Sequence, residues 1–137
     1  MGHVVVPYPL AIIVCDSIHV DPSTGKRTLL GIFSEIGATE FPCRHPQLAV
    51  HVSLTDGRGH IPLKFRLIDC DETEDPLFEA TNEIPFTDPR AILEFGFLIP
   101  NIEFPRAGEY RFQVFANGEF VIERRLIVRQ IGENNNE

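Results

Sequence analysis

Apolar residues recur at every second position along several short segments of this chain. In QLAVHVSLT (47–55) every second residue from Leu48 to Leu54 is Leu or Val, and His51 falls on the opposite, polar face. Successive side chains of a β-strand point to opposite faces of a sheet, so this period predicts a half-buried strand whose polar face, His51 included, is exposed. No window of helical length shows the apolar stripe of an α-helix.

The same alternation marks further segments, which are separated by clusters of turn residues. Their spacing is typical of an all-β sandwich. We therefore expect a single-domain antiparallel β-sandwich of about eight strands over residues 1–131, with a flexible polar tail at 132–137. The expected strands are 10–15, 28–36, 47–55, 60–70, 77–86, 92–99, 109–116 and 119–131.

Turn residues predict how these strands connect. The DGRG sequence at 56–59 and the Asn-Gly pair at 117–118 are signals for tight hairpins. DPSTGK (21–26) predicts a hairpin tip between the first two strands. The segment that contains Pro85 is expected at a sheet edge, because proline cannot donate a hydrogen bond to a neighbouring strand.

The Gly25-Lys26 pair also raises the possibility of a nucleotide site. A phosphate-binding loop needs a glycine five positions before Gly25 and a Ser or Thr directly after the lysine, between a strand and a helix. Val20 and Arg27 hold those two positions, and a strand-like segment follows. The sequence therefore argues against nucleotide binding here.

The segment 105–128 contains a Gly-x-Tyr pattern formed by Gly108 and Tyr110. This segment resembles the last two strands of immunoglobulin-like and fibronectin-like sandwiches, where the tyrosine hydroxyl bonds back to the preceding loop. The resemblance implies an immunoglobulin-like sandwich. The sequence has no Trp and lacks the disulfide pattern of antibody domains, so the likeness carries no function.

Three stretches carry a family resemblance that covers most of the chain. They are 11–36, with its TGK and its Leu-x-Gly-x-Phe motif, then 48–69, and the closing hairpin. Together they resemble a widespread family of small bacterial proteins known only as a domain of unknown function. The resemblance implies a small bacterial β-sandwich, and it brings no assigned activity and no catalytic residues.

Charge and cysteine content limit the partners and the compartment. The net charge of −8 argues against nucleic acid and anionic lipid as partners, since both need a basic face. No segment approaches the roughly 20 apolar residues of a membrane span. Cys15, Cys43 and Cys70 show no disulfide-framework spacing, and the apolar start lacks the basic region of a secretory signal. We therefore expect three free thiols and a cytoplasmic location.

The acidic segment DCDETED (69–75) is a weak candidate for a cation site. Calcium takes six to eight oxygen ligands, which such a loop could supply. The segment lacks the glycine and the final glutamate of an EF-hand loop, so a solvated turn is the simpler interpretation. Its candidate ligands are Asp69, Asp71, Glu72 and Glu74.

Cys43 and His45 are a weak candidate pair for zinc. Structural zinc sites usually show two short ligand spacings, and this sequence offers one. An ordinary loop is the simpler interpretation. The remaining ligands would come from Cys15, Cys70, His51 or His60.

No sequence motif identifies an enzyme. Gly-x-Ser-x-Gly, His-Glu-x-x-His and glycine-rich dinucleotide motifs are all absent from the sequence. We expect no catalytic residue and no cofactor. The leading hypothesis is a non-enzymatic protein-binding or assembly module that uses a sheet edge or an apolar face. The alternatives are a small-molecule or carbohydrate-binding β-sandwich, with or without a bound cation, and an unrecognised hydrolase.

The closing segment 119–131 is apolar on both faces. Leu126 and Val128 lie on one face, and Val121 and Ile127 lie on the other. A strand of a sandwich needs one apolar face, so the second face is expected to be covered. The N-terminal segment, another protein or a second copy could cover it. We expect a homo-oligomer with Val121 and Ile127 at the interface, because most soluble oligomers are symmetric.

Overall fold

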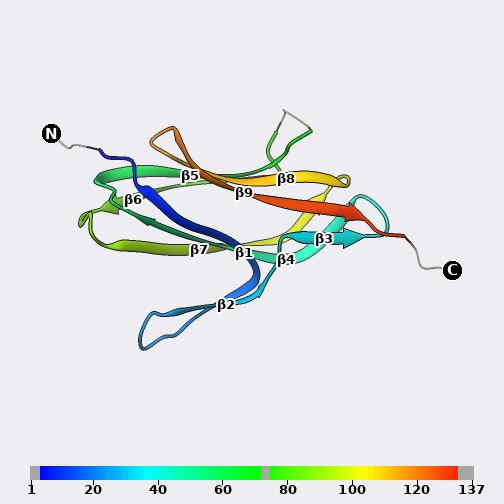
Figure 1. The fold of residues 1–137 in the computed structure, drawn as a ribbon, viewed down its shortest axis with the longest axis horizontal. Helices are drawn as coiled ribbons and strands as arrows, with labels where there is room; N and C mark the ends of the chain where they lie inside the picture. The colour runs from blue at the N-terminus through cyan, green and yellow to red at the C-terminus, as the bar shows by residue number, and fades with distance from the viewer. Residues whose placement is uncertain (1–3, 72–74, 133–137) are drawn as a thin grey trace.

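The structure, a computed structural model, describes residues 4–71 and 75–132 of the chain. These residues form nine β-strands (Figure 1). The predicted tail, apart from Gly132, lies outside the described residues. The strands are β1 (Tyr8–Val20), β2 (Arg27–Ile32), β3 (Glu35–Ala38), β4 (Cys43–Thr55), β5 (Gly59–Asp69), β6 (Phe78–Phe86), β7 (Ile92–Phe104), β8 (Gly108–Ala116) and β9 (Glu119–Gln130).

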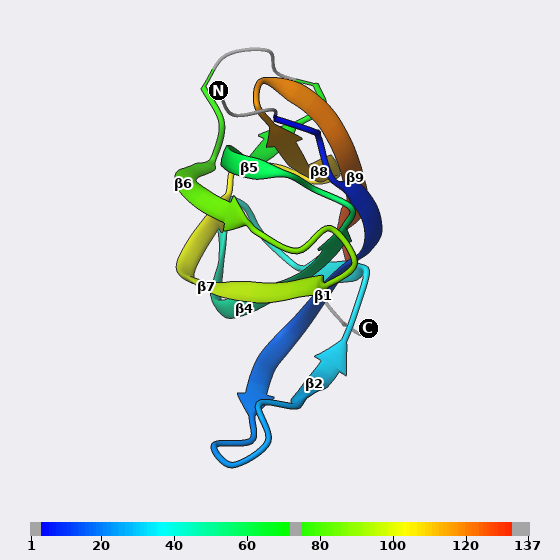
Figure 2. The same ribbon diagram turned by 90° about the vertical axis from the view of Figure 1, so that its left-hand side faces the viewer.

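The strands form two sheets that face each other. The four-stranded sheet has the order β2-β1-β4-β7, and the five-stranded sheet has the order β3-β9-β8-β5-β6. The five-stranded sheet is strongly curled (Figure 2). The chain is therefore an all-β, sandwich-like single domain, as predicted. The arrangement is not purely antiparallel, because β3 pairs with β9 in the parallel direction.

The single strand predicted at 28–36 is in fact two strands in different sheets. The break falls at Phe33 and Ser34. The Phe33 amide donates to the Val14 carbonyl of β1 at 3.1 Å, while the Ser34 carbonyl accepts from the Ile127 amide of β9 at 3.0 Å. Consecutive residues thus bond to opposite sheets. Apolar residues lie on both sides of the break, and no glycine or proline falls between Ile32 and Ile36, which is why the sequence pattern does not mark it.

Two of the three predicted hairpins are confirmed. β8 and β9 pair around Asn117 and Gly118, whose φ angles of 52° and 82° fit a turn with two left-handed residues. β1 and β2 pair around the tip at 21–26, where Gly25 has φ 74°. The hairpin predicted at 56–59 is wrong, because β4 and β5 belong to different sheets and this turn carries the chain between them.

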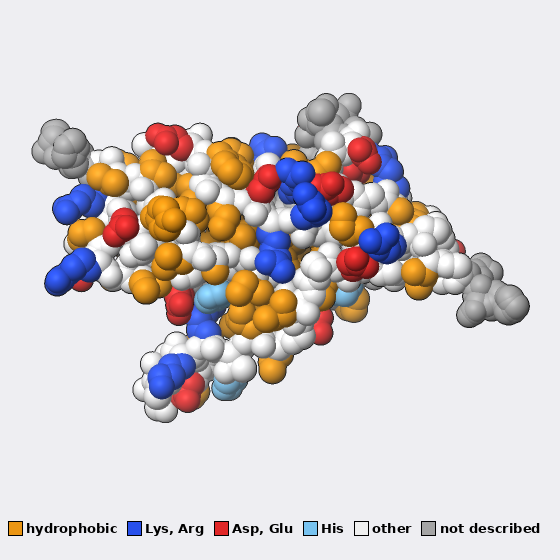
Figure 3. Space-filling model, viewed as in Figure 1, with side chains coloured by type: hydrophobic (Ala, Val, Ile, Leu, Met, Phe, Trp, Pro, Cys, Tyr) orange, Lys and Arg blue, Asp and Glu red, His pale blue; other side chains and the backbone are white. Residues whose placement is uncertain are grey.

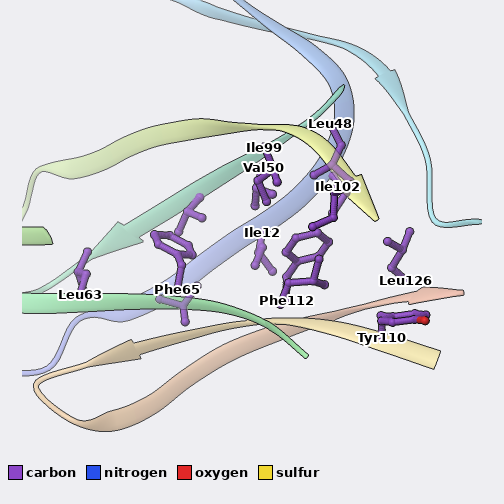
Figure 4. Packing of buried hydrophobic residues seen from close by; sticks show 14 of the residues in the cluster. Ile12, Leu48, Val50, Leu63, Phe65, Ile99, Ile102, Tyr110, Phe112 and Leu126 are labelled. Atoms are coloured by element: carbon purple, nitrogen blue, oxygen red, sulfur yellow. The ribbon is translucent and has the colours of Figure 1, made fainter. Parts of the chain in front are cut away.

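The core lies between the inward faces of the two sheets. Figure 4 shows Val50 and Ile99 from one sheet pointing toward Phe65 and Phe112 from the other. The alternation predicted for 60–70 is confirmed, since Phe65 is buried and its neighbour Lys64 is exposed. The hydrophobic effect on this shared interior is what holds the two layers face to face.

The prediction that His51 is exposed is wrong, because its side chain is only 7% exposed. His51 lies on the outer face of β4 opposite Gly96 of β7, and the β1–β2 hairpin covers this place. A Cβ at Gly96 would lie 2.7 Å from the Ile18 side chain and 2.9 Å from that of Arg27. Burial lowers the pKa of His51, and the neighbouring Arg27 charge lowers it further.

The predicted hydrogen bond of Tyr110 is present. Its hydroxyl donates to the carbonyl of Arg106 in the preceding loop at 2.6 Å. The ring is fully buried and meets Phe104 edge to face at 4.9 Å. This residue therefore ties the β7–β8 connection to the core.

Candidate functional site: an aromatic slot between two free strand edges

β6 and β7 are the last strands of their sheets, and they border the same side of the sandwich (Figure 2). β6 pairs with β5 alone, and β7 pairs with β4 alone. Among the residues that the structure describes, no hydrogen bond joins β6 to β7. Each strand therefore presents one free backbone edge. The prediction that the Pro85 segment forms an edge strand is confirmed.

A small cavity lies between these two edges, and we call it the seam slot. Its volume is about 100 Å³. It opens on the inner faces of β5, β6 and β7, so it is continuous with the hydrophobic core. The residues that line it include Phe65, Phe78, Ala80, Asn82, Phe95 and Phe97.

Aromatic rings close the seam slot on one side. Phe97 of β7 lies 4.2 Å from Phe65 of β5, measured between ring centroids. Phe97 also stacks on Phe78 of β6 at 5.8 Å. These apolar contacts join the two sheets across the seam. Because hydrophobic contacts are non-directional, the same surface can also accept another apolar group.

The seam slot exists because β6 places small or polar residues at inward positions. Ala80 and Asn82 point to the same side as Phe78, where a large apolar residue would normally fill the core. Asn82 lies opposite Leu63 in the strand register and is exposed. The core therefore remains open to solvent along this stretch of β6.

The charged outward side chains of β6 and β7 along the seam are acidic. β6 carries Glu79 and Glu83 on its outer face, and β7 carries Glu94. The Lys64 ammonium lies 3.4 Å from the Glu79 carboxylate, and both side chains are well exposed. An exposed pair of this kind is weak, so the rim keeps an overall negative character.

The acidic segment uses its first carboxylate for structure. Asp69 is 4% exposed, and its carboxylate lies 2.9 Å from the Arg106 guanidinium. It also accepts a hydrogen bond from the Asp71 amide at 3.0 Å. Asp69 thereby links the end of β5 to the β7–β8 connection, where Arg106 lies. Glu72 and Glu74, the other two predicted cation ligands, lie outside the described residues.

The structure does not gather the candidate zinc ligands. Cys43 packs against the core, and the His45 ring lies 5.6 Å from the Phe33 ring. Within residues 4–71 and 75–132, no group of three or more His, Cys, Asp or Glu side chains is arranged to hold a metal ion. All three cysteines are free, as predicted, and burial raises the pKa of each thiol.

The two residues predicted at a homo-oligomer interface lie in different surroundings. Val121 is half-buried and packs against the core. Ile127 lies opposite Glu109 of β8 and Glu35 of β3. Charged side chains of both signs gather over β9 (Figure 3). Self-association through this strand stays a prediction.

The seam slot was not predicted from the sequence. Two signals pointed toward it, namely the edge strand marked by Pro85 and the closely spaced Phe95 and Phe97. Neither signal shows that β6 and β7 border the same seam, because this depends on the order of strands in two separate sheets.

No helix in the described residues is long and apolar enough to cross a membrane. No curated protein matches the chain. The model of a family of unknown function, DUF6941, matches residues 10–129. Because this match covers most of the chain, the protein belongs to the DUF6941 family.

Proposed function

We propose that this protein is a non-enzymatic binding module that accepts an extended segment of a partner protein between β6 and β7. The observation that carries the proposal is the pair of free strand edges on either side of the seam slot. A free edge presents unpaired backbone N–H and C=O groups, and an extended peptide satisfies them by adding a strand. Main-chain hydrogen bonds then supply affinity, and neighbouring side-chain pockets supply specificity.

The size of the seam slot favours a peptide over a small molecule. Ligand pockets usually have volumes of about 300–1,000 Å³. The seam slot has a volume of about 100 Å³, which suits one or two side chains. Alternate residues of an added strand would point inward to this slot, where Phe78 and Phe97 offer apolar contacts.

The charge around the seam indicates which side chains the partner segment would carry on its outward face. Residues of an added strand that point outward would lie beside Glu79 and Glu83 of β6, or beside Glu94 of β7. Opposite charges on neighbouring strands stabilise a sheet, and like charges destabilise it. The net charge of −8 acts in the same direction at longer range. The partner segment is therefore expected to alternate apolar residues with Lys or Arg.

Two prolines limit how far an added strand can pair. Pro85 lies near the end of β6, and Pro100 lies within β7. A proline offers no N–H, so proteins use it to prevent uncontrolled pairing at an edge. The uninterrupted stretches 78–84 and 92–99 remain, and they suit a short segment rather than a whole sheet.

Three finer points belong to the same proposal. The hydrogen bond between Tyr110 and the Arg106 carbonyl supports an immunoglobulin-like type of sandwich. The three free thiols support a reducing, cytoplasmic location. The resemblance of 11–36 and 48–69 to small bacterial proteins supports a bacterial origin.

A peptide-binding experiment tests the proposed function. The probe is a short fluorescent peptide of alternating Val and Lys, and its control is the same peptide with Glu in place of Lys. Fluorescence anisotropy measures both affinities. The wild-type protein is expected to bind the Lys peptide and to reject the Glu peptide.

Two matched variants locate the binding. Asn82→Phe places a ring across the mouth of the seam slot and is expected to abolish binding. Thr28→Phe adds the same ring at an exposed position of β2, the strand at the other end of its sheet from β7, and is expected to leave binding intact. Equal affinities for the two variants, or no binding by the wild type, would reject the seam as the site. Light scattering on the wild type and on Asn82→Phe shows whether a second copy occupies the seam. An assembly that Asn82→Phe dissolves would use the seam and would contradict a foreign partner.

A further inference from the structure

A second hollow lies on the outer face of the five-stranded sheet, and we call it the basic hollow. Its volume is about 240 Å³. It uses the outward residues of β5, whereas the seam slot uses the inward residues of the same strand. The residues that line it are Pro62, Lys64, Arg66, Thr81, Phe115 and Gly118.

The strand register brings the polar groups of the basic hollow together. Lys64 of β5 lies opposite Thr81 on one side and opposite Phe115 on the other. Arg66 follows two positions later on the same face of β5. Two cations, one hydroxyl and one aromatic ring therefore border the same space, on a chain whose net charge is −8.

Arg66 is held in place without a carboxylate partner. Its guanidinium carbon lies 5.6 Å from the centroid of the Phe115 ring, in a cation–π contact. Its Nε atom is buried and has no hydrogen-bond partner. Glu79, which lies opposite Arg66 in the register, approaches Lys64 instead. Among the described residues Arg66 forms no ion pair, and its half-buried charge is free to meet an anion.

Other arginines on the outer face of this sheet differ from Arg66. Arg111 contacts both Glu109 and Glu123, and Arg125 contacts Glu109. The carboxylates on this face thus neutralise the arginines of β8 and β9. The arginine of β5 instead rests on an aromatic ring beside an open hollow.

We propose that the basic hollow binds a small organic anion that carries a carboxylate or phosphate group. The Arg66 guanidinium presents a planar set of donors that matches either oxyanion. Lys64 adds a second charge, since its exposed pair with Glu79 is weak and exchangeable. Thr81 offers a hydroxyl donor, and Phe115 with Pro62 offers apolar surface to the body of the ligand.

The size of the hollow limits the ligand. A volume of about 240 Å³ lies just below the range of about 300–1,000 Å³ that is usual for ligand pockets. A one-ring or short-chain acid fits this volume, and a dinucleotide does not. The site is independent of the seam, so either proposal can fail without the other.

Amide NMR of isotopically labelled protein tests the site with defined probes. Benzoate and phenyl phosphate supply a ring with each oxyanion, and benzamide supplies the ring without charge. Inorganic phosphate supplies the anion alone. Benzoate or phenyl phosphate is expected to produce saturable shifts at the amides of Phe115 and Gly118. Benzamide is expected to produce none. Any binding of inorganic phosphate at these amides assigns recognition to the oxyanion and also supports the site.

Two substitutions with the same charge change separate this site from general attraction. Arg66→Gln is expected to weaken anion binding about tenfold or more, the effect of losing a charge-assisted hydrogen bond. Arg125→Gln, on the same outer face, is expected to leave binding unchanged. Equal shifts with benzamide, or unchanged affinity in Arg66→Gln, would overturn the proposal. Lys64→Gln, at an exposed position, provides the same test if Arg66→Gln does not fold.

Discussion

The two long sides of the sandwich are closed by different forces. On one side, which we call the closed side, β1 meets β9. The Arg124 guanidinium donates to the Ile12 carbonyl at 3.3 Å, and consecutive residues Phe33 and Ser34 bond to opposite sheets. On the other side, which we call the open side, β6 meets β7. There the sheets are joined by the rings of Phe65, Phe78 and Phe97.

This difference decides which side of the sandwich can accept an added strand. On the closed side, directional hydrogen bonds already use three backbone groups of β1 and β9, namely the Ile12 and Val14 carbonyls and the Ile127 amide. Adding a strand there would first require breaking those bonds. On the open side, the contacts are apolar and the edges stay unpaired, so an added strand would gain hydrogen bonds and lose none. The comparison therefore favours the open side as the binding site.

The largest expected effect comes from removing an aromatic ring of the open side. Phe65 is 6% exposed and contacts both Phe95 and Phe97. Phe65→Ala is expected to lower the free energy of unfolding by about 3–5 kcal/mol, as is usual for a buried phenylalanine. Equilibrium urea denaturation measures the loss.

Phe120→Ala provides the control for the Phe65 substitution. Phe120 is 53% exposed, and its ring meets Phe115 on the outer surface. Its removal is expected to change stability by no more than about 0.5 kcal/mol. Similar losses for the two variants would mean that the aromatic cluster does not hold the open side.

The strands on both sides of this comparison were largely predictable, but their partners were not. The alternation of apolar and polar residues correctly placed Phe65 inward and Lys64 outward on β5. It could do so because successive side chains of a strand point to opposite faces. The segment 28–36 is also rich in strand-forming apolar residues and was predicted as one strand, although the chain there passes from one sheet to the other. The spacing of apolar residues within one segment does not show which sheet that strand joins. That choice depends on pairings between residues far apart in the sequence.

The candidate site was less predictable for the same reason. The roles of Ala80 and Asn82 depend on an empty space, and the space exists because β6 faces β7 across the seam. The burial of His51 likewise depends on a hairpin that folds over its strand from elsewhere in the chain. Tyr110 was predictable because its hydrogen bond is local, reaching Arg106 four positions earlier.

A smaller effect is expected from breaking the closed side. Arg124→Met keeps most of the side-chain volume and removes the hydrogen bond to the Ile12 carbonyl. An unsatisfied buried carbonyl costs about 1–3 kcal/mol, so the urea midpoint should fall accordingly. Arg125→Met, at the exposed neighbour that pairs with Glu109, should change stability by about 0–1 kcal/mol. If both variants lose the same amount, Arg124 does not act as a specific bond across this side.

The smallest effect is expected in the pH dependence of stability, through His51 beneath the β1–β2 hairpin. His51 lies beneath this hairpin beside Gly96 of β7, so its charge state reports on the packing next to the open side. Burial and Arg27 lower the pKa of His51 in the folded protein. The unfolded chain then binds the proton more tightly than the folded one. The contribution of neutral His51 to the free energy of unfolding is fully present above the unfolded pKa of about 6.5. It is lost as the pH drops toward the lowered folded value.

His51→Leu isolates this contribution from that of the carboxylates. The variant cannot titrate at this position, so its stability is expected to change less than that of the wild type as the pH falls below about 6.5. Urea denaturation across this range measures the difference between the two slopes. Carboxylates that do not act on His51 contribute equally to both proteins and cancel in that difference, whereas Glu94 raises the pKa of His51 and is part of the measured contribution. Parallel slopes would show that the hairpin leaves His51 accessible to protons in solution. In that event the cover over Gly96 would be loose, and the outer face of β7 would belong with the open side as part of the binding surface.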